Sequence, residues 1–126
     1  MKLHADNADR HAITAYGADW IAINGQRHTH SLVLSASIGV LPWACPRFDE
    51  LTATHFKTLL LQLPEPPELL LLGSGSRLRF VRPALLQDLI SRRIGVETMD
   101  TPAACRTFNI LAGEGRRVAA VLLLGD

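Results

Sequence analysis

Two short segments of this sequence combine the residue types from which anion sites and nucleophiles are built. The first, Gly73-Ser74-Gly75-Ser76, follows an apolar run at residues 69–72, and the second covers residues 101–107 after a predicted strand at residues 96–99. A helix that begins directly after a strand presents free backbone N–H groups to an anion. We therefore take seven residues as candidate ligand-binding residues: Gly73, Ser74, Gly75, Thr101, Cys105, Arg106 and Thr107.

The glycine-containing segment resembles half of a dinucleotide-binding fingerprint. Its third glycine is absent, and residues 77–81 are predicted to be extended rather than to open a helix on a pyrophosphate. The lysine of a phosphate-binding P-loop is missing as well. We interpret the segment as a glycine turn at the carboxyl end of a buried strand, where α/β sheets place their ligand crevices.

Cys105 lies in or just after the first turn of the second segment's predicted helix, beside Arg106. A helix N-terminus and a neighbouring cation lower the pKa of a thiol and favour a nucleophile. No histidine lies near in sequence to act as its base, and small buried cysteines commonly pack helices. Core packing is the simpler interpretation, and we assign no catalytic residue.

The same helix start carries a capping signal. We expect the Thr101 hydroxyl to accept a hydrogen bond from the backbone N–H of Ala103 or Ala104, with Pro102 at the first helical position, where its missing donor is harmless.

His28 and His30 are the one histidine pattern that suggests a metal. In a strand both imidazoles project to one face, as two ligands of a metal ion require. No third ligand is identifiable, so we interpret them as exposed histidines on a strand. We predict no metal and no cofactor.

The arginines are unevenly distributed although the formal net charge is only +1. Residues 77–117 contain eight arginines and four acids, and Arg77 and Arg79 would share one face of a strand, as a phosphate-contacting stripe requires. We interpret these two and Arg82 as a solvated edge that discourages strand pairing, and we predict no nucleic-acid partner.

The first part of the chain has the pattern of strands. Residues 12–16 and 20–23 are predicted strands, and Asn24-Gly25 is the strongest two-residue signal for a hairpin. A third strand is expected at residues 29–36, which completes an antiparallel meander.

From about residue 46 the pattern changes to helices that alternate with short apolar runs. A helix capped by Asp49 or Thr52 is expected to end before Pro64, and another opens at Pro83 and ends at Gly95. A third helix covers residues 101–112. Strands are predicted at residues 68–73, 96–99 and 117–124, and the first and last of them are apolar on both faces. The alternation implies a mixed, largely parallel central sheet with its helices.

The strands of this sheet are expected to supply the core. We predict that six residues lie in adjacent central strands, buried on both faces: Leu70, Leu72, Val96, Val118, Ala120 and Leu122.

Length and composition predict one α/β domain spanning residues 1–126. The polar N-terminus lacks the apolar stretch of a secretory signal, and the leucine runs at 59–63 and 69–72 are too short to span a membrane. Cys45 and Cys105 have no paired spacing, so we expect reduced thiols and a soluble, cytoplasmic protein.

Three segments of the chain together resemble the domain of unknown function 498 family. They are residues 99–126, PPELLLLGSGS at 66–76 and YGADWIAING at 16–25. The block formed by Met99, Thr101, AACRT, Asn109 and the later Glu114 and Arg116 carries the resemblance most specifically. Phe108 stands where the family often has tyrosine.

The family includes bacterial and archaeal proteins of unassigned activity and, in eukaryotes, complex I assembly factor 3 and an adipogenesis-associated protein. The resemblance implies a three-layer β plus α/β/α fold and brings no accepted catalytic residues with it.

Two functions remain open. The first is a non-catalytic, assembly-type module that binds a protein partner. The alternative is an enzyme or a protein that binds a small anion in a crevice between the Gly73 loop and the Thr101 helix start. We favour the first, because the second lacks an evident general base or nucleophile pair.

Overall fold

The computed structural model describes residues 10–36, 38–45 and 47–125. The expectation about a secretory signal concerned residues 1–11, of which residues 1–9 lie outside this range, as do Ser37, Pro46 and Asp126. The strands are β1 (Ile13–Tyr16), β2 (Ile21–Ile23), β3 (Gln26–His28), β4 (Leu32–Ser35), β5 (Gly39–Pro42), β6 (Leu69–Gly73), β7 (Gly95–Met99) and β8 (Val118–Leu122). The helices are η1 (Phe48–Glu50), α2 (Ala53–Gln62), η2 (Pro83–Leu86), α3 (Gln87–Ser91) and α4 (Thr101–Gly113), of which η1 and η2 are 3₁₀ helices.

Strands β1, β2 and β3 form an antiparallel sheet. Asn24 and Gly25 both have positive φ, 50° and 84°, as a two-residue hairpin turn requires, so pairing resumes at once with Gln26 opposite Ile23. The meander is therefore confirmed. Its third strand is Gln26–His28 and not residues 29–36, because the strand begins directly after the two-residue turn.

Five strands form the central sheet in the order β5-β4-β8-β6-β7. β6 runs parallel to β7 and to β8, whereas β4 is antiparallel to β5 and to β8. The prediction of a mixed sheet is confirmed. Its antiparallel half comes from β4, which the sequence pattern had assigned to the meander, and from β5, which had not been predicted.

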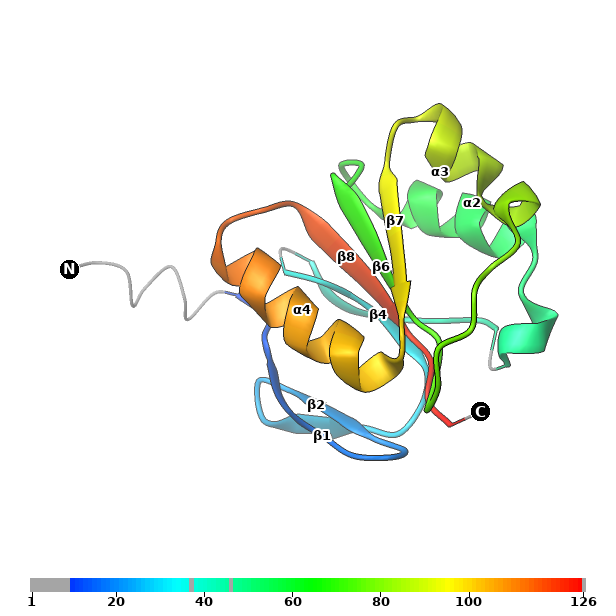
Figure 1. The fold of residues 1–126 in the computed structure, drawn as a ribbon. Helices are drawn as coiled ribbons and strands as arrows, with labels where there is room; N and C mark the ends of the chain where they lie inside the picture. The colour runs from blue at the N-terminus through cyan, green and yellow to red at the C-terminus, as the bar shows by residue number, and fades with distance from the viewer. Residues whose placement is uncertain (1–9, 37, 46, 126) are drawn as a thin grey trace.

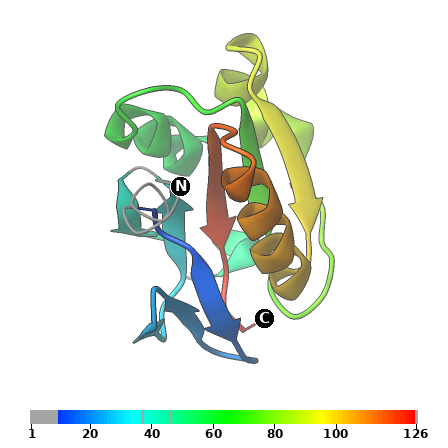
Figure 2. The ribbon, with the colours of Figure 1, turned by 90° about the vertical axis from the view of Figure 1, so that its left-hand side faces the viewer.

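The central sheet separates two hydrophobic cores. Figure 1 shows α4 on one face and α2 with α3 on the other. Because side chains alternate along a strand, Leu70 and Leu72 of β6 join the α2 side while Leu71 joins the α4 side, where Phe108 packs. The first sheet contributes Ile13 to the core on the α4 side. Figure 2 shows this sheet at the bottom of the molecule, away from α3 at the top. This is the predicted β plus α/β/α architecture.

Polar side chains attach the first sheet to α4. The Asn109 side chain accepts a hydrogen bond from the Ile13 N–H at 2.9 Å and donates one to the Ile13 carbonyl at 2.7 Å. The Arg106 guanidinium donates to the Tyr16 hydroxyl at 2.8 Å. Asn109 thus pairs with β1 as the backbone of a neighbouring strand would.

Of the two predicted caps for the helix before Pro64, Thr52 is confirmed, whereas the predicted end of the next helix at Gly95 is wrong. α2 begins after Thr52, whose N–H donates to His55 Nδ1 at 3.0 Å, and Asp49 belongs instead to η1. Gly95 does not end the helix that follows Pro83, because it is already the first residue of β7. Arg93 takes the positive φ of 59° after the helix.

The predicted core is correct for five of its six residues. Val96 is only half-buried because β7 is an edge strand of the sheet. The other five are at most 4% exposed: Leu70, Leu72, Val118, Ala120 and Leu122.

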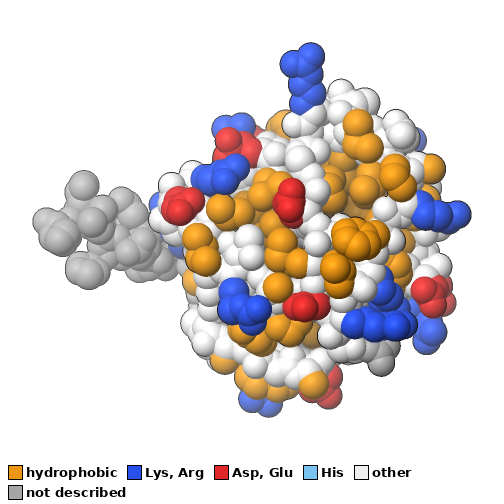
Figure 3. All heavy atoms as spheres, in the orientation of Figure 1, with side chains coloured by type: hydrophobic (Ala, Val, Ile, Leu, Met, Phe, Trp, Pro, Cys, Tyr) orange, Lys and Arg blue, Asp and Glu red, His pale blue; other side chains and the backbone are white. Residues whose placement is uncertain are grey.

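Several large hydrophobic side chains remain exposed on the surface. Phe80, Leu78 and Ile110 have exposed fractions of 72%, 49% and 60%, and Figure 3 shows hydrophobic atoms interspersed with charged ones on the face of α4 and β7. None of the helices within the described ranges is long and apolar enough to cross a membrane.

Leu72→Ala is expected to lower the free energy of unfolding by roughly 2–5 kcal/mol, because the side chain is fully buried in an interior strand. Urea denaturation measures this loss. The matched control is Leu61→Ala on α2, where the side chain is 79% exposed and the change is expected to stay within about 0.5 kcal/mol. A loss below about 1 kcal/mol for Leu72→Ala would contradict the burial of this strand on both faces.

Candidate functional site

The two candidate segments meet at the carboxyl ends of β6 and β7. The Gly75 N–H donates to the Thr101 hydroxyl at 2.9 Å, and the Thr101 N–H donates to the Gly75 carbonyl at 2.8 Å. The Thr101 hydroxyl in turn donates to the carbonyl of Leu123, just after β8, at 2.6 Å. The two segments are therefore hydrogen-bonded to each other. Their N–H, hydroxyl and carbonyl groups at this junction already have partners within the protein.

Glycine is required at two positions of this junction. A Cβ on Gly73 would lie 2.9 Å from the Thr101 hydroxyl oxygen, and Gly75 has a φ of +105° with its Cβ position 2.5 Å from the Gly125 carbonyl oxygen. No larger side chain fits this close approach. The interpretation of the segment as a glycine turn agrees with this packing.

The predicted cap at the start of α4 is wrong. Asp100 is the N-cap, with extended backbone, and its carboxylate accepts from the Ala103 N–H at 2.8 Å. Thr101 is already inside the helix, and its side chain is turned towards Leu123. A buried hydroxyl needs partners, and here they come from segments far away in the sequence rather than from its own helix.

Ser74 is fully buried, and its hydroxyl forms hydrogen bonds to the segment that follows it. Its hydroxyl donates to the Arg77 carbonyl at 2.7 Å and accepts from the Arg79 N–H at 3.0 Å. Arg77 and Arg79 consequently do not lie in a strand, and the expectation that they share a strand face is wrong.

Cys105 lies in the hydrophobic core on the α4 side of the sheet, with no exposed surface. Burial raises the pKa of its thiol to about 12, and the opposing charge of Arg106 does not offset this. Arg106 is exposed, and Thr107 is half-buried on the same helix. The structure favours core packing over a nucleophile at Cys105.

The two histidines lie at the end of the first sheet. His28 ends β3 and is half-buried, whereas His30 follows in the loop and is exposed. Among the residues that the structure describes, no three histidine, cysteine or acidic side chains group as a metal site.

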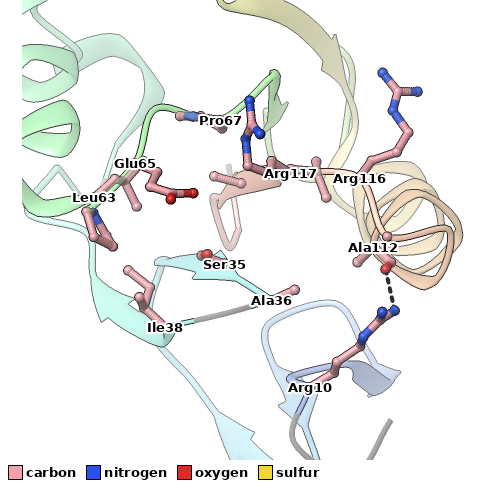
Figure 4. Close-up of a pocket in the computed structure, with 14 residues that line it drawn as sticks. Arg10, Ser35, Ala36, Ile38, Leu63, Glu65, Pro67, Ala112, Arg116 and Arg117 are labelled. Carbon is pink, nitrogen blue, oxygen red and sulfur yellow. Dashed lines mark hydrogen bonds between the residues drawn. The ribbon is translucent and has the colours of Figure 1, made fainter. Parts of the chain in front are cut away.

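Sequence reasoning missed a pocket of about 540 Å³ near the amino end of β8 (Figure 4). Segments from four parts of the chain line it, which is why no local spacing indicated it. Its charged groups do not converge: the Arg10 guanidinium donates to the Ala112 carbonyl at 2.7 Å, and Arg116 points away from Glu65. The pocket lies apart from all seven predicted ligand-binding residues, whose role in ligand binding stays a prediction.

The chain matches a family model described as a protein of unknown function, DUF498/DUF598, over residues 13–123. It is 32% identical to human NADH dehydrogenase (ubiquinone) 1 alpha subcomplex assembly factor 3 over 96% of this chain and 65% of that protein. It is 34% identical to an uncharacterised protein of Rhodobacter capsulatus over 88% of this chain and 82% of the other. The chain thus spans about three fifths of the length of the mammalian relatives.

A solved structure from Bordetella parapertussis superposes with a TM-score of 0.84 at 36% identity, covering 91% of this chain and 96% of that one. The fold is therefore shared with experimentally determined proteins.

Thr101→Val is expected to destabilise the protein by about 1–3 kcal/mol, because it leaves the buried Gly75 N–H without its acceptor while preserving side-chain shape. Thr101→Ser retains the hydroxyl and is expected to cost less than half as much. Thermal and urea unfolding of both variants measure the difference. Equal stability of the Val variant and the wild type would contradict the role of the hydroxyl.

Neither thiol is expected to react with a disulfide reagent such as DTNB at pH 8 while the protein is folded. Burial raises the pKa of both Cys45 and Cys105, and with a pKa of about 12 only about one Cys105 in ten thousand is a thiolate at that pH. Both thiols are expected to react rapidly in denaturant, with peptide mass spectrometry assigning the sites. Rapid labelling of Cys105 in the folded protein would restore the nucleophile interpretation.

Proposed function

The chain belongs to the DUF498/DUF598 family of proteins of unknown function, and on that basis we propose that it is a non-catalytic protein-binding module of the assembly type. The mammalian relatives are named assembly factors, and an assembly factor acts on other proteins. The proposal transfers only this mode of action to the present chain. It includes a cytoplasmic location, which is supported by two cysteines that are both unpaired.

The observation that carries the proposal is the pair of large apolar side chains exposed among arginines, Leu78 and Phe80. Aromatic side chains and arginines are enriched in protein interfaces, and here both occur together on one short segment. The side chains that could take part in catalysis, by contrast, are either hydrogen-bonded within the protein or buried. The hydroxyls of Ser74 and Thr101 bond within the protein, and the thiol of Cys105 is buried.

The alternative, anion binding at the start of α4, has less support. Three N–H groups near that helix end already have acceptors: the Thr101 N–H bonds to Gly75, and those of Ala103 and Ala104 bond to Asp100. An anion would have to displace these bonds, so we do not propose this function.

Photo-crosslinking in the native cell tests the proposal. Benzoylphenylalanine is placed at three exposed positions on different elements, Leu61, Phe80 and Ile110. We expect light-dependent adducts with the same protein in replicate cultures at one or more of these positions. Native mass spectrometry of the purified complex is expected to give a fixed stoichiometry. No specific adduct at any position would contradict a protein-binding function.

A further inference from the structure

The segment between β6 and η2 presents alternating basic and apolar side chains. Its residues 77–82, called here the arginine loop, read Arg-Leu-Arg-Phe-Val-Arg. Val81 is 8% exposed and belongs to the core, whereas Phe80 next to it is 72% exposed. The loop is thus anchored by one apolar side chain and displays another.

The loop is held in place although it has no regular secondary structure. The Arg79 guanidinium lies over the Phe48 ring at 4.7 Å and donates to the Ser74 carbonyl at 3.0 Å. The Ser74 hydroxyl accepts from the Arg79 N–H, and the Ser76 N–H donates to the Gly125 carbonyl at 3.1 Å. A surface held in this way loses little entropy when it binds a partner.

A hollow of about 320 Å³ lies beside Phe80. Its walls come from η1 and the residue after it, from the arginine loop and from η2, and its lining is mostly apolar. The lining residues are Phe48, Asp49, Leu51, Phe80, Val81, Arg82 and Leu85. A hollow of this kind suits one large apolar side chain inserted by a partner, with Phe80 packing against it.

The charges around the hollow favour an acidic partner. Arg77, Arg79 and Arg82 lie on the loop, and in the part of the chain that the structure describes none of them forms a salt bridge. Asp49 is the one carboxylate in the lining of the hollow. Figure 3 shows Lys and Arg atoms close to hydrophobic ones at the right of this face, where the loop passes.

We propose that the arginine loop and this hollow form a docking site for an acidic peptide segment that carries one large apolar anchor. The site deepens the proposed function and depends on it. A concave hollow lined mostly by apolar side chains suits a single inserted side chain rather than a flat lipid surface, and its Asp49 carboxylate would repel an anionic headgroup. A second copy of the chain would place its own three arginines against these.

Selection from a phage library of random 12-residue peptides, with the folded protein as bait, tests the chemistry of the partner. We expect enriched peptides with Asp or Glu flanking Phe, Leu or Trp. Phe80→Ala is expected to lower the affinity for a selected peptide about tenfold or more. The double change Arg77→Gln with Arg82→Gln is expected to lower this affinity and to make it less dependent on salt concentration. The matched controls are Ile110→Ala and Arg92→Gln, on exposed positions elsewhere, with changes below about twofold.

A neutral or basic consensus, or peptides that bind Phe80→Ala as tightly as the wild type, would overturn the proposal. So would binding to vesicles of phosphatidylglycerol and phosphatidylcholine that Phe80→Ala abolishes, or a wild-type dimer that the same change dissociates in ultracentrifugation. Circular dichroism checks that each variant is folded. If crosslinking captures a partner through Leu61 or Ile110 but never through Phe80, the proposed function stands and this site falls.

Discussion

The Thr101 hydroxyl joins three segments that are far apart in the sequence. It accepts from the Gly75 N–H after β6 and donates to the Leu123 carbonyl after β8, while its own residue begins α4. Because the hydroxyl is buried, water does not compete for these hydrogen bonds. Without the hydroxyl, the Gly75 N–H and the Leu123 carbonyl would each lose a hydrogen-bond partner. The position of α4 relative to the sheet, and the direction in which the chain leaves β6 towards the arginine loop, both depend on this contact.

Local patterns predicted the elements that are formed by local interactions. The Asn24-Gly25 turn and the apolar runs of β6 and β8 depend on a few neighbouring residues, and these predictions were correct. The apolar run at residues 32–35 could serve either sheet, and its place was decided by pairing with β8, some 85 residues later. For β7, the polar Glu97 and Thr98 within the strand were a usable sign of an edge position.

The candidate site was predictable in place but not in detail. Parallel neighbours such as β6 and β7 end at the same edge, so their following segments had to meet. The Thr101 hydroxyl bonds to a carbonyl just after β8, which nothing near Thr101 in the sequence indicates, whereas the Ser74 hydroxyl bonds to Arg77 and Arg79. Residues 77–81 were predicted to be extended, but they form no strand, because the Ser74 side chain accepts from the Arg79 N–H that a neighbouring strand would otherwise bind.

The central position of β8 also affects how the chain is made. β8 lies between β4 and β6, so before it is in place the five-stranded sheet consists of two unconnected pairs, β4 with β5 and β6 with β7. During synthesis both pairs expose an apolar edge until residue 122 has left the ribosome. Sheet closure is therefore a late, long-range step, and an unpaired apolar strand edge before that step is the kind of surface that favours aggregation.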